Sequence, residues 1–287
     1  MGIAFDSIFT AIRVFKNLSG CFVFELLFPL LFTIYIIDRR KTLSLQCFSV
    51  LFMEFGKVYL LPTPIADKCP SVCLPSENLD CLLRCDVFVV EELRTARRFL
   101  RKAGYKRDFA DVEFFILNEH TLKEDLSPCI ELLRSGKSVG VMSEAGLPCV
   151  ADPGCTFVAL CQREGFEVIP LSGPSSLMMA LMASGFNGQS FAFVGYLPAE
   201  KSARNKRIRE LETLVYRFNQ TQIFIETPYR NDHLLESLIE VCSNGTMLCV
   251  ACDIGGESQK IVSKSIAEWK QSKFSLHKKN TVFLLSK

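Results

Sequence analysis

From Lys57 onward, short apolar runs alternate along the chain with segments of helical periodicity. Runs that are closed by proline, glycine or a polar residue predict strands, and periodic segments closed by glycine predict helices. The predicted strands are 58–61, 87–91, 114–117, 139–143, 168–171, 191–194, 222–226, 248–251 and 282–285. The predicted helices are 92–102, 126–134, 155–164, 175–183, 203–217 and 233–241.

Most of these strands are apolar throughout, and helices separate them. This pattern indicates an α/β protein whose sheets are covered by helices on both faces. Such sheets bind their ligands in the loops that follow the carboxyl ends of the strands. The functional residues should therefore lie directly after each apolar run.

Residues 1–55 have a different character from the rest of the chain. Residues 21–37 are almost all apolar, interrupted by Glu25 and Pro29, and three basic residues follow at 39–41. A membrane-spanning helix needs about 20 apolar residues, with a lower limit near 17, so this segment is at the limit of length. No cleavage site typical of a signal peptide follows it.

Three interpretations of this extension remain open. It can be a single membrane anchor, an interfacial or loosely packed helix, or sequence upstream of a natural start at Met53. We favour the start at Met53, which leaves four residues between it and the first predicted strand. If the anchor is real, the basic flank after the segment keeps the rest of the chain on the cytoplasmic side.

The composition is that of a globular protein, with 49% hydrophobic and 22% charged residues in 287. The formal net charge of +2 gives no overall basic surface, so any nucleic-acid contact must come from a local patch. The 13 cysteines are scattered through apolar runs, without the paired spacings of zinc sites. We therefore expect no metal, reduced thiols and a cytoplasmic location.

The loops after the strands are the most distinctive parts of the chain. They are Leu61–Asp67, Ser143–Pro148, Ala151–Gly154, Leu171–Ser176, Gly195–Pro198 and Glu226–Arg230. Glycine and small residues let a backbone approach a ligand closely, and proline restricts the movement of the loop. Any one of these loops alone is more simply interpreted as an ordinary turn. Their recurrence after successive strands favours a binding site.

Several common motifs are absent from the sequence. It contains no G-x-G-x-x-G after the first strand, no G-x-x-x-x-G-K-[ST] and no G-x-S-x-G. These absences argue against a dinucleotide-binding Rossmann domain, a P-loop and an α/β-hydrolase. The three histidines have no triad-like or zinc-binding spacing.

From Gly56 to the C-terminus, the loops resemble the tetrapyrrole-methylase superfamily. The branch that 2′-O-methylates a cytidine ribose in small-subunit ribosomal RNA typically shows T-P-I-G-N, E-D-T-R, S-D-A-G-T-P-x-x-S-D-P-G, P-G-P-S-A, G-F-L-P and F-E-S-P-H-R, in that order. The corresponding blocks in this chain are Thr63–Asp67, Glu91–Arg94, Ser143–Gly154, Ser172–Ser176, Gly195–Pro198 and Ile225–Arg230. The resemblance covers about four-fifths of the chain and excludes residues 1–55.

The resemblance implies two α/β domains with mixed sheets, at 57–170 and 171–287, with S-adenosylmethionine folded into the cleft between them. It implies that the cofactor is bound by Thr63, Pro64, Ser143, Glu144, Ala145, Gly146, Leu147, Gly173, Pro174, Ser175, Ser176 and Tyr196. It further implies ribosomal RNA or the small ribosomal subunit as the partner, and we expect a homodimer.

The chain departs from the family pattern at several positions. Ala66-Asp67 replaces Gly-Asn, Glu92-Leu93 replaces Asp-Thr, Glu144 replaces Asp, and Tyr229 replaces His. The loops attributed to the methyl donor are the better kept. The departures therefore put the exact substrate in doubt more than the binding of the donor.

Methyl transfer to a ribose hydroxyl requires alignment of oxygen, methyl and sulfur, together with removal of a proton. Glu144, Asp152 and Glu226 are the candidate proton acceptors, and we rank Glu226 first, with Glu144 next. A structural ion pair between Glu226 and Arg230, four residues on, is an equally good interpretation of that spacing.

Two basic clusters are candidate contacts for RNA phosphates. One follows Glu92 and includes Arg94, and the other, at 201–209, includes Arg204 and Arg207. Tyr229 and Arg230 complete the expected RNA-contacting residues, since exposed aromatic rings can stack on bases. The simpler interpretation of either cluster is a solvated helix face.

Two other functions remain open. One is methylation of a tetrapyrrole or another small metabolite on the same fold. The other is a membrane-tethered binding protein that has lost catalysis, which the apolar segment 21–37 and the altered Glu92-Leu93 block allow.

Overall fold

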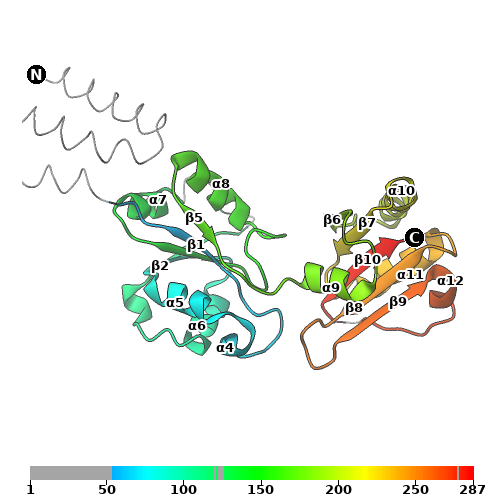
Figure 1. The fold of residues 1–287 in the computed structure, drawn as a ribbon, viewed down its shortest axis with the longest axis horizontal. Coiled ribbons are helices and arrows are strands. Elements are labelled where there is room, and N and C mark those ends of the chain that lie inside the picture. Colours follow the sequence, from blue (N-terminus) through cyan, green and yellow to red (C-terminus); the bar gives the residue numbers. More distant parts are fainter. Residues whose placement is uncertain (1–53, 119–120, 122–125, 277) are drawn as a thin grey trace, which may run out of the picture. The chain divides into compact units, whose positions relative to one another are not determined.

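The computed structural model describes residues 54–118, 121, 126–276 and 278–287 (Figure 1). By its internal contacts, Glu54–Lys287 is one unit. The extension predicted over 1–55 lies outside the described residues up to position 53, and so does its apolar segment 21–37. Among the helices that the structure describes, none is both long and apolar enough to cross a membrane.

Five short strands form the first sheet in the order β3-β2-β4-β1-β5, and every neighbouring pair is parallel. Their bounds are β1 Val58–Leu61, β2 Val87–Val90, β3 Glu113–Ile116, β4 Val139–Met142 and β5 Val168–Pro170. The inner strands β2 and β4 are buried along their whole length, as expected for a parallel sheet with helices on both faces.

Side chains alternate between the two faces of this sheet because successive residues of a strand point in opposite directions. Val87 and Val89 pack with α7 (Ser127–Arg134) and α8 (Gly154–Glu164), while Phe88 and Val90 pack with α5 (Ser76–Arg84) and α6 (Leu93–Lys102). Figure 1 shows the two helix pairs on opposite sides of the strands. Two short helical segments, α4 (Pro70–Cys73) and η1 (Phe109–Asp111), complete this part.

The second sheet is mixed and has the order β6-β7-β10-β8-β9. Its strands are β6 Phe191–Tyr196, β7 Thr221–Ile225, β8 Met247–Cys252, β9 Lys260–Ser265 and β10 Thr281–Ser286. Only the β6–β7 pair is parallel, and the other neighbours run antiparallel.

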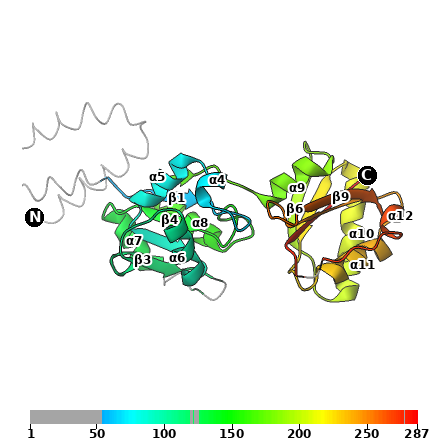
Figure 2. The same cartoon turned by 90° about the horizontal axis from the view of Figure 1, so that it is seen from below.

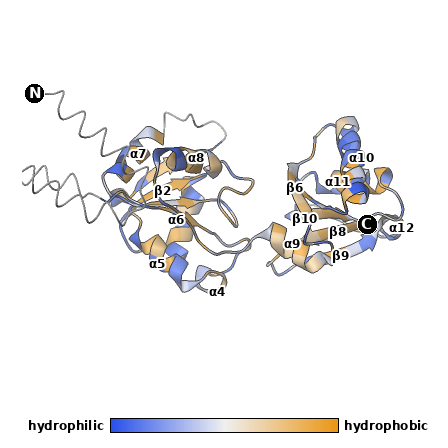
Figure 3. Cartoon of the chain, turned by 45° about the horizontal axis from the view of Figure 1, so that its top comes forward, coloured by the Kyte–Doolittle hydropathy of each residue, from blue (hydrophilic) through white to orange (hydrophobic). Residues whose placement is uncertain are grey.

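Helices cover this sheet on both faces as well. α10 (Lys201–Phe218), α11 (Asn231–Val241) and α12 (Ile266–Trp269) pack on one face, and α9 (Ser176–Ser184) packs on the other (Figure 2). The strands are coloured mainly as apolar in Figure 3, whereas much of α10 is hydrophilic, as expected for a helix with one solvated side.

The prediction of a two-part α/β fold is confirmed, with one refinement: the first sheet is parallel throughout and only the second is mixed. Elements without a continuous apolar run were not predicted. The edge strand β9, with the sequence KIVSKS, alternates in polarity, and α5 is a short amphipathic helix. The domain boundary at 170/171 stays a prediction.

Candidate functional site

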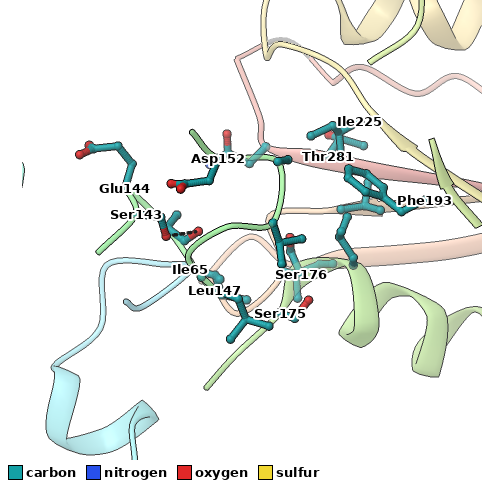
Figure 4. Close-up of a pocket in the computed structure, with 18 of the residues that line it drawn as sticks. Ile65, Ser143, Glu144, Leu147, Asp152, Ser175, Ser176, Phe193, Ile225 and Thr281 are labelled. Atoms are coloured by element: carbon teal, nitrogen blue, oxygen red, sulfur yellow. Dashed lines mark hydrogen bonds between the residues drawn. The ribbon is translucent and has the colours of Figure 1, made fainter. Parts of the chain in front are cut away.

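A cavity of about 390 Å³ opens beside the loops that follow the carboxyl ends of the strands. Pockets for small molecules and cofactors typically enclose about 300–1,000 Å³, so the size suits such a ligand. Residues from both sheets and their loops line it (Figure 4). Eight of the predicted cofactor residues are among them: Ser143, Glu144, Ala145, Gly146, Leu147, Ser175, Ser176 and Tyr196.

The other four predicted cofactor residues, Thr63, Pro64, Gly173 and Pro174, are not part of the cavity lining. Thr63 is buried, exchanges backbone hydrogen bonds with Gly146 at 2.9 and 3.1 Å, and donates its hydroxyl to the Ser143 carbonyl at 3.3 Å. Thr63 thus joins the loop that follows β1 to the loop that follows β4. Its placement is that of a support for the cavity wall.

Two glycines allow these loops to approach each other. A Cβ atom at Gly173 would lie 2.1 Å from the Pro62 Cβ, which is impossible without movement of the backbone. Gly146 has φ +81°, and a Cβ there would meet Ile65 at 3.2 Å and the Pro174 carbonyl at 3.4 Å. Both glycines therefore permit contacts between loops. Gly146 in addition lines the cavity.

The first turn of α9 faces the cavity through Ser176. Ser175 is the N-cap residue, and its hydroxyl accepts a hydrogen bond from the Met178 amide at 3.4 Å. The free N–H groups at such a helix start can bind polar or anionic ligand atoms.

Asp152 lines the cavity and also braces its own loop. One carboxylate oxygen, Oδ1, accepts hydrogen bonds from the Gly154 amide at 2.7 Å and the Cys149 amide at 3.2 Å. Burial raises the pKa of this carboxyl above its usual value, although these two hydrogen bonds oppose the shift. Asp152 therefore has a structural task in addition to any contact with a ligand.

Glu144 is exposed, and its carboxylate points away from Phe193, Ile225 and Thr281 on the other side of the cavity (Figure 4). Partial burial raises the pKa of Glu144, and the negative charges of Glu92 and Asp152 act in the same direction. The neighbouring Glu92 is the N-cap of α6, because its carboxylate accepts hydrogen bonds from the Arg94 and Thr95 amides. Glu92, which stands where the family motif has Asp, thus starts this helix.

Glu226 follows β7, and its side chain is almost fully buried, with 1% exposed. Its Oε1 accepts hydrogen bonds from the Thr227 amide and from the Arg230 guanidinium, both at 2.6 Å. Its Oε2 is buried and has no hydrogen-bond partner in the described part of the chain. A buried, unpaired carboxylate oxygen is unfavourable, and Glu226 lines the cavity. Glu226 thus forms the ion pair with Arg230 through Oε1 and keeps Oε2 as an acceptor without a donor.

The structure corrects the prediction that Arg204 binds RNA phosphates. Arg204 is only 7% exposed, and its guanidinium donates hydrogen bonds to the Ala199 carbonyl at 2.7 Å and the Ser237 hydroxyl at 3.0 Å. It lies on the buried side of α10 and ties this helix to α11. The basic spacing alone did not distinguish the inner from the outer side of the helix.

The remaining predicted RNA contacts are accessible to solvent to different degrees. Arg94 is exposed, Arg207 is partly exposed and pairs with Glu210 at 3.0 Å, and Arg230 is held by Glu226. Within the first basic cluster, Arg101 lies over the Phe109 ring and donates to backbone carbonyls, so it has a structural role. Tyr196 and Tyr229 are 56% and 71% exposed.

Sequence reasoning did not assign four further residues to the cavity lining. They are Ile65, Phe193, Ile225 and Thr281, as Figure 4 shows. Ile65 and Ile225 lie in the motif blocks 63–67 and 225–230, which could have identified them, whereas Phe193 and Thr281 lie in strands outside these blocks. Among the described residues, no group of three or more His, Cys, Asp or Glu side chains lies close enough together to hold a metal ion.

Relatives and solved structures of similar sequence or fold agree with this architecture. Ribosomal RNA small subunit methyltransferase I of Vibrio cholerae serotype O1 is 29% identical over 211 residues, 74% of this chain and 65% of that protein. The proteins of the same name from Thermotoga maritima and Bacillus subtilis are 32% and 30% identical, over 65% and 75% of this chain and 78% and 69% of their own lengths.

Two solved structures share the fold. The methyltransferase CobJ has a TM-score of 0.54 at 17% identity and covers 80% of this chain and 94% of its own. The uroporphyrin III C-methyltransferase from Thermus thermophilus has a TM-score of 0.53 at 17% identity and covers 81% of this chain and 98% of its own. The family model described as Tetrapyrrole (Corrin/Porphyrin) Methylases matches residues 74–270. The loops around the cavity, the two sheets and this match agree, and the chain belongs to the tetrapyrrole methylase family.

Proposed function

We propose that this protein is an S-adenosylmethionine-dependent methyltransferase that methylates a ribose 2′-hydroxyl in small-subunit ribosomal RNA. The names of its relatives and the six loop blocks described above support this proposal. The chain spans 65% of the length of the Vibrio protein, so the activity of that whole protein is itself part of the proposal.

The cavity fits the methyl donor in size and in chemistry. Ile65, Leu147 and Phe193 offer apolar contacts, while the start of α9 and the loop at 143–147 offer polar backbone groups. When bound, S-adenosylmethionine supplies a methyl group on a positively charged sulfur, which is already an activated leaving group. The task of the protein is then to align the acceptor oxygen and take its proton.

The single observation that carries the mechanism is the unpaired Oε2 of Glu226. A ribose hydroxyl that donates a hydrogen bond to this oxygen would satisfy a buried acceptor and be positioned for proton transfer. Arg230 and the Thr227 amide hold Oε1, so the carboxylate is fixed in place. Oε2 would then be placed to take the proton of this hydroxyl when its oxygen accepts the methyl group.

The partner in this proposal is ribosomal RNA or the small ribosomal subunit, contacted by Arg94, Arg207, Tyr229 and Arg230. A cytoplasmic location and a homodimer belong to the same proposal. Exposed apolar side chains on α9, Met178 and Met182, support an interface between two copies. Sedimentation of the full chain over a range of concentrations tests the homodimer.

The test of the function uses tritium-labelled S-adenosylmethionine and small ribosomal subunits from bacteria that lack the corresponding relative. We expect label in small-subunit RNA, in a dinucleotide that resists alkaline cleavage because the methylated 2′-oxygen can no longer attack the phosphate. Calorimetry of the full chain should show binding of S-adenosylmethionine and S-adenosylhomocysteine. Label in a tetrapyrrole instead of RNA, or absence of donor binding, would contradict the proposal.

A further inference from the structure

The turn that follows β7 is fixed by hydrogen bonds on several sides. The Thr227 amide donates to Glu226 Oε1, and the Arg230 amide closes the turn by donating to the Thr227 carbonyl at 2.9 Å. The Pro228 carbonyl accepts from the Lys278 amide at 3.2 Å, which attaches the turn to the loop before β10. The backbone on both sides of Tyr229 is therefore held in one conformation.

The side chain of Tyr229 is nevertheless 71% exposed. In the described part of the chain, no hydrogen bond or ring contact of this side chain is found. An aromatic ring buries about 150–250 Å² when it finds a partner, so an exposed ring forgoes a large stabilisation. The backbone that carries the ring is already held, so binding would order only the tyrosine side chain, which favours a role in recognition.

The position of Tyr229 relates it to the proposed acceptor site. Glu226, Thr227 and Pro228, the residues directly before it, all line the cavity. Tyr196 stands at the end of the neighbouring strand β6, where it pairs with Ile225. Tyr229 therefore directly follows three lining residues and stands three positions after the residue proposed to accept the proton.

Cationic side chains stand near Tyr229, and one of them, Arg230, is paired with Glu226. Arg230 follows Tyr229 directly, and the attached loop carries Lys278 and Lys279, both exposed. An exposed aromatic ring beside cationic side chains is the combination that binds single-stranded nucleic acid, since bases stack on the ring and phosphates contact the cations. An uncharged apolar partner would leave these cations unpaired.

We propose that Tyr229 stacks on a nucleobase of single-stranded RNA next to the ribose that is methylated. This inference rests on the proposed function and adds a requirement to it: the target segment must be unpaired, with at least one base turned out of its own stack. Stacking tolerates any base, so Tyr229 selects for an unpaired strand and contributes affinity.

Ultraviolet crosslinking tests the contact directly, because a stacked ring and base can join covalently without a linker. The full chain is irradiated with small ribosomal subunits from bacteria that lack the corresponding relative, and crosslinked peptides are identified by mass spectrometry. We expect RNA attached to the peptide that contains Tyr229. Binding of the subunit by Tyr229→Leu should weaken about 5- to 150-fold, whereas Tyr229→Phe, which keeps the ring, should bind like the parent.

Phe218 provides the matched control. It is 55% exposed at the end of α10 and is not part of the cavity lining, so Phe218→Leu should leave RNA binding unchanged. Calorimetry with S-adenosylmethionine should give the parent affinity for all three variants, which shows that they fold. Parent-like binding by Tyr229→Leu, or crosslinks only elsewhere while methylation persists, would overturn the stacking and leave the function standing. Failure of the parent to methylate or bind the subunit would overturn both. A crosslink to a ribosomal protein at Tyr229 would assign the ring to a protein contact.

Discussion

At Glu226 the two carboxylate oxygens have different surroundings, and this difference is the basis of the proposed mechanism. Oε1 is held by two donors, while Oε2 is buried without one. The ion pair with Arg230 and a role in proton transfer were competing interpretations of the sequence. The geometry allows both, because each uses a different oxygen.

Glu226→Gln should therefore separate binding from chemistry. The amide keeps an acceptor for Thr227 and Arg230 but replaces the free oxygen by an NH₂ group, which cannot take a proton. We expect methyl transfer to fall about 10²- to 10⁴-fold, the usual contribution of a general base. The dissociation constant for S-adenosylmethionine should stay at the parent value. Single-turnover tritium transfer and calorimetry measure the two quantities.

Glu144→Gln is the matched control, because Glu144 also lines the cavity but is exposed. If this variant loses transfer and Glu226→Gln does not, the proton acceptor is Glu144. The pH profile would then agree, since a base works only when it is deprotonated. The raised pKa of Glu144 would move the acid-side loss of activity to a higher pH than for an ordinary carboxyl.

On α10, we expect substitution of Arg204 to change stability and substitution of its solvent-accessible neighbours to change RNA binding. Arg204→Gln should lower the free energy of unfolding by about 1–3 kcal/mol, because the Ala199 carbonyl and Ser237 hydroxyl lose a charged donor. The salt dependence of RNA binding should not change. Replacing the solvent-accessible Lys206 and Arg207 by Gln should instead flatten the slope of log affinity against log salt by about one to two units. Thermal unfolding and salt titrations measure these effects. A change of the salt slope in Arg204→Gln, without a loss of stability, would show that Arg204 contacts RNA.

The loops that follow β1, β4 and β5 are joined to one another by direct contacts. Sequence reasoning identified these loops and assigned Thr63 and Gly173 to the ligand, which stays a prediction, but it did not foresee that both join loops to each other. The residues that contact the cavity and those that hold its walls are of the same small and polar types. Their spacing in the sequence therefore cannot distinguish them, and only the packing of three distant segments does.

Gly173→Ala tests this loop junction. The added Cβ would lie 2.1 Å from the Pro62 Cβ, so the loops must separate. We expect a loss of about 1–3 kcal/mol in the free energy of unfolding, typical of overpacking, and a weaker affinity for S-adenosylmethionine. Gly188→Ala is the control, since a Cβ there meets nothing within 4 Å. Equal stability of the two variants in thermal unfolding would show that the junction tolerates movement.

For the whole molecule, the apolar strand pattern predicted the α/β class, and the loop motifs predicted the family. The antiparallel pairing of β10 between β7 and β8 could not be read from the same pattern. A buried strand is apolar on both faces whichever direction its neighbours run, so the sequence of β10, TVFLLS, is compatible with either pairing. Strand direction follows instead from the lengths and paths of the connections.

The last prediction concerns the chain before the described unit. The unit is anchored at its start by the hydrogen bond from the Gly56 amide to the Leu133 carbonyl at 2.8 Å and by the Phe55 ring on Phe166 at 5.4 Å. A variant that begins at Met53 keeps these contacts, and we expect it to unfold at the parent temperature and to bind S-adenosylmethionine with the parent affinity. A variant that begins at Val58 after an initiating methionine loses them and should be less stable. An insoluble product from the Met53 start would show that residues 1–52 pack into the core. Fractionation of both forms with membranes completes the test: if only the full chain sediments with them, the segment 21–37 is an anchor.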